Sequence, residues 1–442
     1  MGRHEKQLML PLVGAHSASD VNSKINHDPV HVRRATFMGG LGEPVHRWFR
    51  LTPSFAPDLV RRMLAETGAD KDAVVYDPFA GASTTLIEAR AQGLKCMGSE
   101  INPFLHWVGQ TSLDWDPSPE SMADSSRSVA GAFLSLKQQY GASTVEDLPV
   151  GVPKIHNVYR WWRPDVLKDI LLLKEAMTRT CENGGISNLL RLALAGVLVP
   201  DLTNVTLGRL QLFFIDRSAD DIRVLETWEA KVSQITEDLG QMTEATKAVR
   251  HMLRLQDATK VVASDFPLKA THVITSPPYP NRYSYVWNTR PHLYMFNFFT
   301  STAQASDLDK STIGGTWGAA TSCLAKGILQ PEYAAIQRHV VPVADAIRAS
   351  DNLMANYLIK YFNLLCRQIL QMRSILADRA RMAYVVGCSR LKGVYVETDV
   401  LLAQVCESLS SEFRAREVAR IRRRHSGKEL HESIVYVDYS RQ

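Results

Sequence analysis

Residues 275–279 (Thr-Ser-Pro-Pro-Tyr) combine groups that could hold a planar amine. They follow an apolar run at 271–274, which is typical of the end of a buried parallel strand. Two consecutive prolines cannot continue a β-ladder, because each lacks a backbone N–H and has a φ fixed at about −65°. The chain therefore leaves the sheet in a stiff loop at a carboxyl end, where α/β sheets bind ligands. Ser276 could hydrogen-bond an amine there, and Tyr279 could stack on its ring.

A second set of residues follows three predicted strands in order. Residues 77–85 (Asp-Pro-Phe-Ala-Gly-Ala-Ser-Thr-Thr) form the first strand-to-helix turn, where Gly81 would let the backbone approach a ligand. Glu100 ends the second strand, where nucleoside-binding folds put an acid on ribose hydroxyls. Asp265 is expected to end the third strand, where a carboxylate could meet an adenine amine. Each signal is weak alone, but their order on successive strands favours a nucleoside cofactor.

The elements that position these residues begin in the order strand, turn, helix, strand, which is typical of a βαβ unit. Helical spacing of apolar residues predicts helices at 57–64, 84–92 and 351–378. The predicted strands lie at 73–76, 94–99, 260–265, 272–275, 381–387 and 433–437, the last of them at an edge of the sheet.

The chain is expected to contain one catalytic domain with an insertion. Residues 1–45 lack periodicity and predict an irregular N-terminal arm. Residues 46–114 and 256–442 would form the catalytic domain, and long amphipathic patterns at 115–255 predict a helical insertion. The insertion competes with a Ser- and Gly-rich segment at 300–335, expected to be a mobile loop region, for recognition of a target.

Composition permits these interpretations and excludes others. The chain has 442 residues with 45% apolar and 22% charged content, which is ordinary for a soluble globular protein. A net charge of +5 permits a polyanionic partner without requiring one. The six scattered cysteines form no C-x-x-C pair, which argues against a zinc site and fits a reducing cytoplasm. No signal peptide is evident, and no apolar stretch reaches the roughly 20 residues that span a bilayer. We therefore expect no metal and no membrane.

The two motifs together resemble those of the S-adenosylmethionine-dependent amino-methyltransferases of DNA, which carry a D-P-F-x-G turn and a [DNS]-P-P-[YFW] loop. The resemblance covers residues 46–110 and 256–440 and implies an α/β, Rossmann-like fold with a mostly parallel seven-stranded sheet. It implies S-adenosyl-L-methionine as the cofactor. Ser83 departs from the pattern, because a second glycine is usual there. The residues carried over as cofactor-binding are Thr52, Asp77, Phe79, Gly81, Ser83, Thr84, Glu100, Asn102 and Asp265.

The resemblance also implies the reaction. Serine at the first loop position is typical of cytosine-N4 methylation, with adenine-N6 methylation as the alternative and an RNA or protein-amide substrate as a weaker one. Hydrogen bonds from the cytosine amine to Ser276 and to the Pro277 carbonyl would direct its lone pair at the cofactor's methyl group. Transfer would depend on positioning rather than on a covalent intermediate. The catalytic residues expected are Ser276, Pro277, Pro278 and Tyr279.

A paired base must leave the duplex to present its amine, so Tyr279 would stack on a flipped ring. Arg282 is the best candidate for contacts beside that base. Arg422, Arg423 and Arg424 could hold phosphates, although a solvated basic loop fits them equally well. The partners expected are double-stranded DNA and, as a further candidate, a cognate restriction endonuclease in a bacterial or archaeal cytoplasm.

Overall fold

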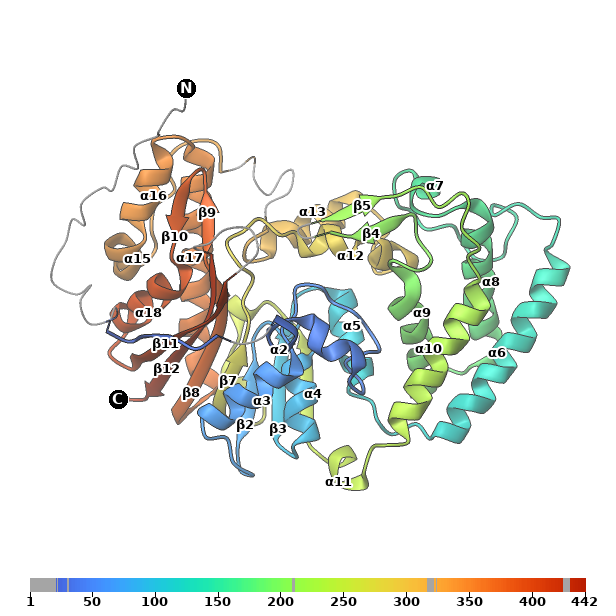
Figure 1. The fold of residues 1–442 in the computed structure, drawn as a ribbon, viewed down its shortest axis with the longest axis horizontal. Helices are drawn as coiled ribbons and strands as arrows, with labels where there is room; N and C mark the ends of the chain where they lie inside the picture. The colour runs from blue at the N-terminus through green and yellow to red at the C-terminus, as the bar shows by residue number, and fades with distance from the viewer. Residues whose placement is uncertain are drawn as a thin grey trace.

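The computed structural model describes residues 21, 23–29, 32–208, 211–315, 322, 324–423 and 430–442. An eight-stranded sheet in the order β1-β11-β12-β8-β7-β2-β3-β6 forms its centre (Figure 1). The strands of this sheet are β1 (Ile25–His27), β2 (Val74–Asp77), β3 (Lys95–Glu100), β6 (His251–Leu255), β7 (Ala270–Thr275), β8 (Leu376–Gly387), β11 (Phe413–Arg423) and β12 (His431–Ser440).

The directions of the strands confirm the predicted fold class. Strands β6, β3, β2, β7 and β8 run parallel, and β12 joins β8 antiparallel as one arm of a β11–β12 hairpin. This order and hairpin make a Rossmann-like methyltransferase sheet. The sheet has one strand more than the seven predicted, because β1 pairs parallel with β11. That strand comes from the segment expected to be an irregular arm, which also forms α2 (Val32–Ala35) and η1 (Phe37–Gly42).

Helices cover both faces of the sheet (Figure 1). One face carries α3, α4 and α5, and the opposite face carries α17 and α18, whose buried residues pack with Tyr76 and Val273 of the central strands. These and neighbouring elements are α3 (Pro57–Glu66), α4 (Thr84–Ala91), α5 (Pro103–Ser112), α12 (Tyr285–Met295), α13 (Thr302–Ser311), α15 (Ala334–His339), α16 (Val341–Arg348), α17 (Asn352–Met372), η4 (Arg373–Ile375), β9 (Ser389–Leu391), β10 (Val394–Val396) and α18 (Thr398–Leu409).

Three predicted elements differ from the structure. The third parallel strand is β6, within the range assigned to the insertion, and 258–265 instead forms the short turns η2 (Ala258–Lys260) and η3 (Ala263–Asp265). Strand β6 lies at the sheet edge and buries only Leu253, so no apolar run announces it. Strand β12 is internal rather than an edge, since β11 covers it. The predicted loop at 300–335 contains helix α13, which begins at a Ser301–Gln304 capping box.

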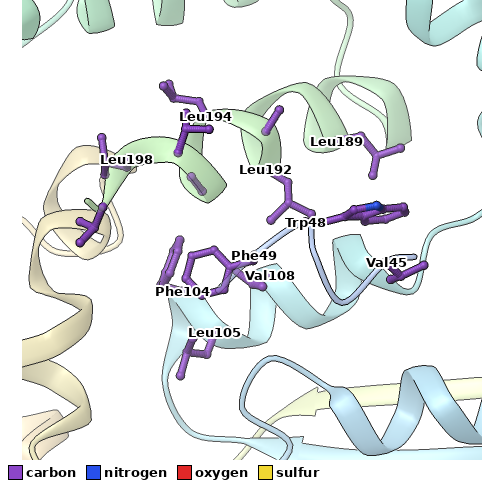
Figure 2. Packing of buried hydrophobic residues seen from close by; sticks show 14 of the residues in the cluster. Val45, Trp48, Phe49, Phe104, Leu105, Val108, Leu189, Leu192, Leu194 and Leu198 are labelled. Atoms are coloured by element: carbon purple, nitrogen blue, oxygen red, sulfur yellow. The ribbon is translucent and has the colours of Figure 1, made fainter. Parts of the chain in front are cut away.

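The predicted insertion is helical and forms a lobe beside the sheet (Figure 1). Its core is nevertheless continuous with that of the catalytic domain. Figure 2 shows Leu192 of α9 beside Trp48, with Phe49 and Phe104 packed below Leu198. The elements of this region are α6 (Pro119–Gln139), α7 (Val158–Trp161), α8 (Pro164–Thr180), α9 (Gly185–Leu198), β4 (Val205–Leu207), β5 (Leu212–Phe214), α10 (Val224–Leu239) and α11 (Glu244–Lys247).

A buried carboxylate on α10 fixes the segment before the first helix of the catalytic domain. Asp238 is fully buried and accepts hydrogen bonds from the Val45 amide at 3.0 Å and the Trp48 indole at 2.7 Å. It also forms an ion pair with Arg47 at 2.5 Å. A buried carboxylate is tolerated only with such a full set of donors. The insertion and residues 45–48 therefore form one packed unit.

Replacing Asp238 tests this unit. Asp238→Ala should lower the free energy of unfolding by about 3 kcal/mol, because it leaves the Val45 amide and the Trp48 indole without an acceptor and removes the buried carboxylate that pairs with Arg47. Glu237→Ala is the matched control, since Glu237 is 65% exposed and pairs with the same arginine. It should cost less than about 1 kcal/mol. Urea denaturation followed by circular dichroism measures both, and equal losses in the two variants would contradict the role of Asp238.

Candidate functional site

A pocket that opens to solvent lies at the carboxyl ends of β2, β3, β6 and β7. Both motifs reach it, although they are almost 200 residues apart in the sequence. The residues that line it are Pro78, Phe79, Gly81, Glu100, Ile101, Asn102, Leu105, Gln256, Asp257, Ala258, Ser276, Pro278, Tyr285, Val286, Leu308, Ser311, Thr312 and Ile313.

Asp77 joins the two motifs directly. Its Oδ1 atom accepts a hydrogen bond from Thr275 Oγ1 at 2.6 Å and from the Phe79 amide at 2.9 Å. The side chain is buried, and burial raises the pKa of Asp77 to about 6, although these hydrogen bonds favour the charged form. Asp77 does not line the pocket. In this structure it fixes the glycine turn after β2 against the proline loop after β7.

The turn after β2 adopts the backbone conformation that glycine favours at two positions. Gly81 has φ +52° and lines the pocket, with Leu51 packed behind it. Ser83 has φ +67°, so it takes the conformation of the glycine usual in this motif. The Ser83 hydroxyl points away from the pocket, toward Gly109 of α5, where an added Cβ would lie 2.2 Å from it. Thr84 also leaves the pocket and lines a separate hollow behind the turn.

Glu100 lies in the pocket wall with both carboxylate oxygens held by backbone amides. Its Oε2 accepts from the Gly81 amide and its Oε1 from the Asn102 amide, each at 2.8 Å. Burial raises the pKa of Glu100 to about 7, and these two amides oppose that shift. The Asn102 side chain also lines the pocket, but its Oδ1 caps α5 by accepting from the Phe104 amide and its Nδ2 donates to Thr289 Oγ1, each at 3.0 Å.

The far wall differs from the prediction. Asp265 belongs to η3 instead of ending a strand, and its Oδ2 accepts hydrogen bonds from the Val262 amide at 2.7 Å and from Gln256. The pocket is lined by Gln256, Asp257 and Ala258, which follow the third strand, and not by Asp265. Sequence reasoning missed these residues because it placed the strand about nine residues too late. Asp265 thus contacts the pocket through the Gln256 side chain.

The proline loop contributes two residues to the pocket, Ser276 and Pro278. Ser276 Oγ donates a hydrogen bond to the Val385 carbonyl at 3.2 Å, so the lone pairs of the Ser276 oxygen point away from that carbonyl. Pro277 is buried between them. Tyr279 does not line the pocket as described, and its hydroxyl donates to Glu432 of β12 at 2.8 Å.

Two further parts of the site were not found from the sequence. Tyr285 and Val286 of α12 form an outer wall, together with residues 308 and 311–313 at the end of α13. No motif in the sequence marks either segment. Thr52, which was predicted, lines a neighbouring hollow that shares the Tyr285 side chain. Its buried hydroxyl has no hydrogen-bond partner among the described residues.

The predicted basic residues lie in three different situations. Arg282 is exposed, with φ +62°, directly after the proline loop. Arg422 is instead half-buried and forms an ion pair with Glu432, so it is not a free phosphate ligand in this structure. Arg423 ends β11, and its side chain lies outside the described residues, as does Arg424. The described residues hold no cluster of His, Cys, Asp or Glu placed to bind a metal ion.

Comparisons with known sequences agree with the motifs. Over 195 residues, 43% of this chain, the sequence is 24% identical to Type II methyltransferase M.MvaI of Kocuria varians, covering 40% of that protein. Over 71 residues, 16% of this chain, it is 30% identical to Type II methyltransferase M.BsoBI of Geobacillus stearothermophilus, covering 14% of it. Over 88 residues, 20% of this chain, it is 30% identical to Type II methyltransferase M.AvaI of Nostoc sp., covering 17% of it. Each match thus spans less than half of the relative's own length.

These matches confirm the resemblance that the motifs predicted, and they support S-adenosylmethionine as the cofactor, which methyltransferases of this kind use. No family model matches the chain. Among solved structures, an rRNA methyltransferase aviRa from Streptomyces viridochromogenes aligns over 87% of this chain and 86% of its own, with 12% identity and a TM-score of 0.30. TrmN from Thermus thermophilus aligns over 91% and 52%, with 9% identity and a TM-score of 0.29. TM-scores this low do not establish a shared fold, and the fold assignment rests on the strand order.

Within the described parts of the chain, no helix combines the length and the apolar composition that crossing a membrane takes.

The contact between Ser83 and Gly109 gives a test of the turn. Gly109→Ala should displace the turn after β2, because the new Cβ would lie 2.2 Å from Ser83 Oγ and 2.7 Å from Leu253. We expect a loss of about 2 kcal/mol in the free energy of unfolding. Gly131→Ala on α6 is the control, since a Cβ there meets nothing within 4 Å. It should stabilise by about 0.5 kcal/mol. Thermal denaturation distinguishes the two, and a Gly109 variant as stable as the Gly131 variant would contradict this packing.

Proposed function

We propose that this protein is an S-adenosylmethionine-dependent DNA methyltransferase that transfers a methyl group to the N4 amine of a flipped cytosine. The observation that carries the proposal is the Asp77–Thr275 hydrogen bond, which holds the turn after β2 and the proline loop at one pocket. A transfer of this kind needs its two substrates within near-attack distance, and a fixed pair of motifs supplies that geometry.

The residues of the pocket fit the cofactor. Glu100 offers a carboxylate for ribose hydroxyls, and Gln256 and Asp257 offer polar groups beyond it for the adenine amine. Phe79, Gly81 and Ser276 also line the pocket, and the methionine part would lie against them. When bound, the cofactor would supply an electrophilic methyl group. Asp265 would act on the adenine end through Gln256.

The proline loop suits an exocyclic amine. Because the Ser276 hydroxyl donates a hydrogen bond to the Val385 carbonyl, its oxygen remains as an acceptor for an amine hydrogen. The Pro277 carbonyl would accept the second hydrogen. Both bonds draw the nitrogen toward tetrahedral geometry, which frees the lone pair that resonance otherwise delocalises into the ring. The prolines restrict the loop backbone, so little conformational freedom is lost when the base binds.

Duplex DNA is the proposed substrate, because the two motifs resemble those of the amino-methyltransferases of DNA and the Type II relatives favour it. The base must be flipped out to reach the loop, and Tyr279 would stack on it. Exposed Arg282 would contact the phosphates beside the flipped base. We propose that the insertion predicted at 115–255, apart from strand β6 at its end, is a target-recognition region of the catalytic unit. A cognate restriction endonuclease remains a proposed partner.

Methyl transfer to DNA tests the proposal. The protein should be incubated with methyl-labelled S-adenosylmethionine and duplex DNA of mixed sequence, and the digested nucleosides separated by chromatography. We expect label in N4-methylcytosine. Ser276→Ala should lower kcat about 100-fold, because one positioned acceptor of the amine is lost.

Ser374→Ala is the matched control, since that serine also donates to a backbone carbonyl but lies in η4, just before the start of β8 and at the opposite end of the strands from the pocket. Its activity should equal that of the wild type. Label in N6-methyladenine would replace the cytosine assignment with the adenine one. Label in RNA or protein and none in DNA would overturn both assignments, and full activity of Ser276→Ala would refute the role of its hydroxyl.

A further inference from the structure

The hydroxyl of Tyr279 is held by a residue far along the chain. It donates a hydrogen bond of 2.8 Å to Oε1 of Glu432, which lies 153 positions later at the start of β12. Glu432 pairs with Gly387 at the carboxyl end of β8, so it lies at the same end of the strands as the proline loop. The topology therefore brings the β11–β12 hairpin against the loop proposed to hold the base.

Glu432 is equipped to act as a fixed acceptor. Glu432 is only 6% exposed. Its second oxygen, Oε2, forms an ion pair with Arg422, which is its cross-strand partner on β11. The two oxygens thus have separate partners, and the guanidinium keeps the carboxylate oriented toward Tyr279. A charged acceptor in a buried position makes a stronger hydrogen bond than a neutral one.

This contact removes the freedom that the prolines leave. Pro277 and Pro278 restrict the backbone before Tyr279, but the tyrosine ring still has two rotatable bonds. Holding the hydroxyl fixes the far end of the ring and hence the plane on which a base would stack. Stacking requires that plane to be in position before the base arrives, since ordering it at binding costs affinity.

We propose that Glu432 is a positioning residue for Tyr279 and that Arg422 supports it. This proposal rests on the proposed stacking role of Tyr279. It also gives Arg422 a function different from the phosphate contact expected from the sequence. The arginine run at 422–424 would then begin with a residue that orients the site.

The same chain holds a matched control for this arrangement. Tyr439 donates to Glu412 Oε1 at 3.1 Å, and Glu412 forms an ion pair with Arg373 at 2.9 Å. This second tyrosine–glutamate–arginine group lies at the opposite end of the strands, because Tyr439 pairs with Ala380 near the start of β8. A loss of stability common to both groups can therefore be separated from an effect on the site.

The test compares Glu432→Ala, Glu432→Gln and Tyr279→Phe with Glu412→Ala and Tyr439→Phe in the full-length protein. We expect Glu432→Ala and Tyr279→Phe each to lower kcat/KM for DNA about tenfold, with the KM for S-adenosylmethionine unchanged. The double variant should be no worse than either single one, because both remove the same contact. Glu432→Gln keeps an acceptor for the hydroxyl and should stay within about threefold of the wild type, as should both control variants.

Hydrogen exchange supplies a readout that needs no activity. The amides of residues 281–283, which form the turn after Tyr279, should exchange faster in Glu432→Ala than in Glu412→Ala. Equal exchange and equal kcat/KM in these two variants would overturn the positioning role. If the wild type labels RNA or protein instead of DNA, the substrate proposal fails, and the same variants compared on that substrate still decide the role of Glu432.

Discussion

The hydrogen bond between Asp77 and Thr275 is the constraint on which the candidate site depends. It joins the last residue of β2 to the last residue of β7, two strands adjacent in the sheet but almost 200 residues apart in sequence. Asp77 is buried, so the bond operates where water does not compete for it. The glycine turn and the proline loop consequently have one fixed relation, and both contribute residues to the pocket.

The insertion takes part in this arrangement instead of forming a separate body. Asp238 of α10 holds Arg47 and Trp48, and the same segment continues to Leu51, which packs behind Gly81 of the cofactor turn. The shared core seen in Figure 2 has the same consequence. A segment that reads DNA in the insertion would therefore be coupled mechanically to the wall of the pocket that we propose for the cofactor.

The sequence predicted the parts of the fold and site that local chemistry determines. The proline pair, the glycine turn and Glu100 each impose a backbone shape or a charge that is visible in a few residues. The third strand was predicted too late in the sequence, because β6 is an edge strand that buries little apolar surface. Asp265 was therefore expected in the pocket, which is lined instead by the residues that follow β6. The Glu432 contact and the α13 wall arise from tertiary packing between distant segments, which no local pattern encodes.

Titration of S-adenosylhomocysteine by calorimetry tests most directly whether this pocket holds the cofactor. The wild type should bind one equivalent, and Glu100→Gln should bind at least tenfold more weakly, because we propose that the Glu100 carboxylate accepts hydrogen bonds from the ribose hydroxyls. Burial raises the pKa of Glu100 to about 7, so wild-type affinity should increase from pH 6 to pH 8 as the carboxylate ionises, and the variant should lack this increase. Equal binding by the two proteins at every pH would contradict the account.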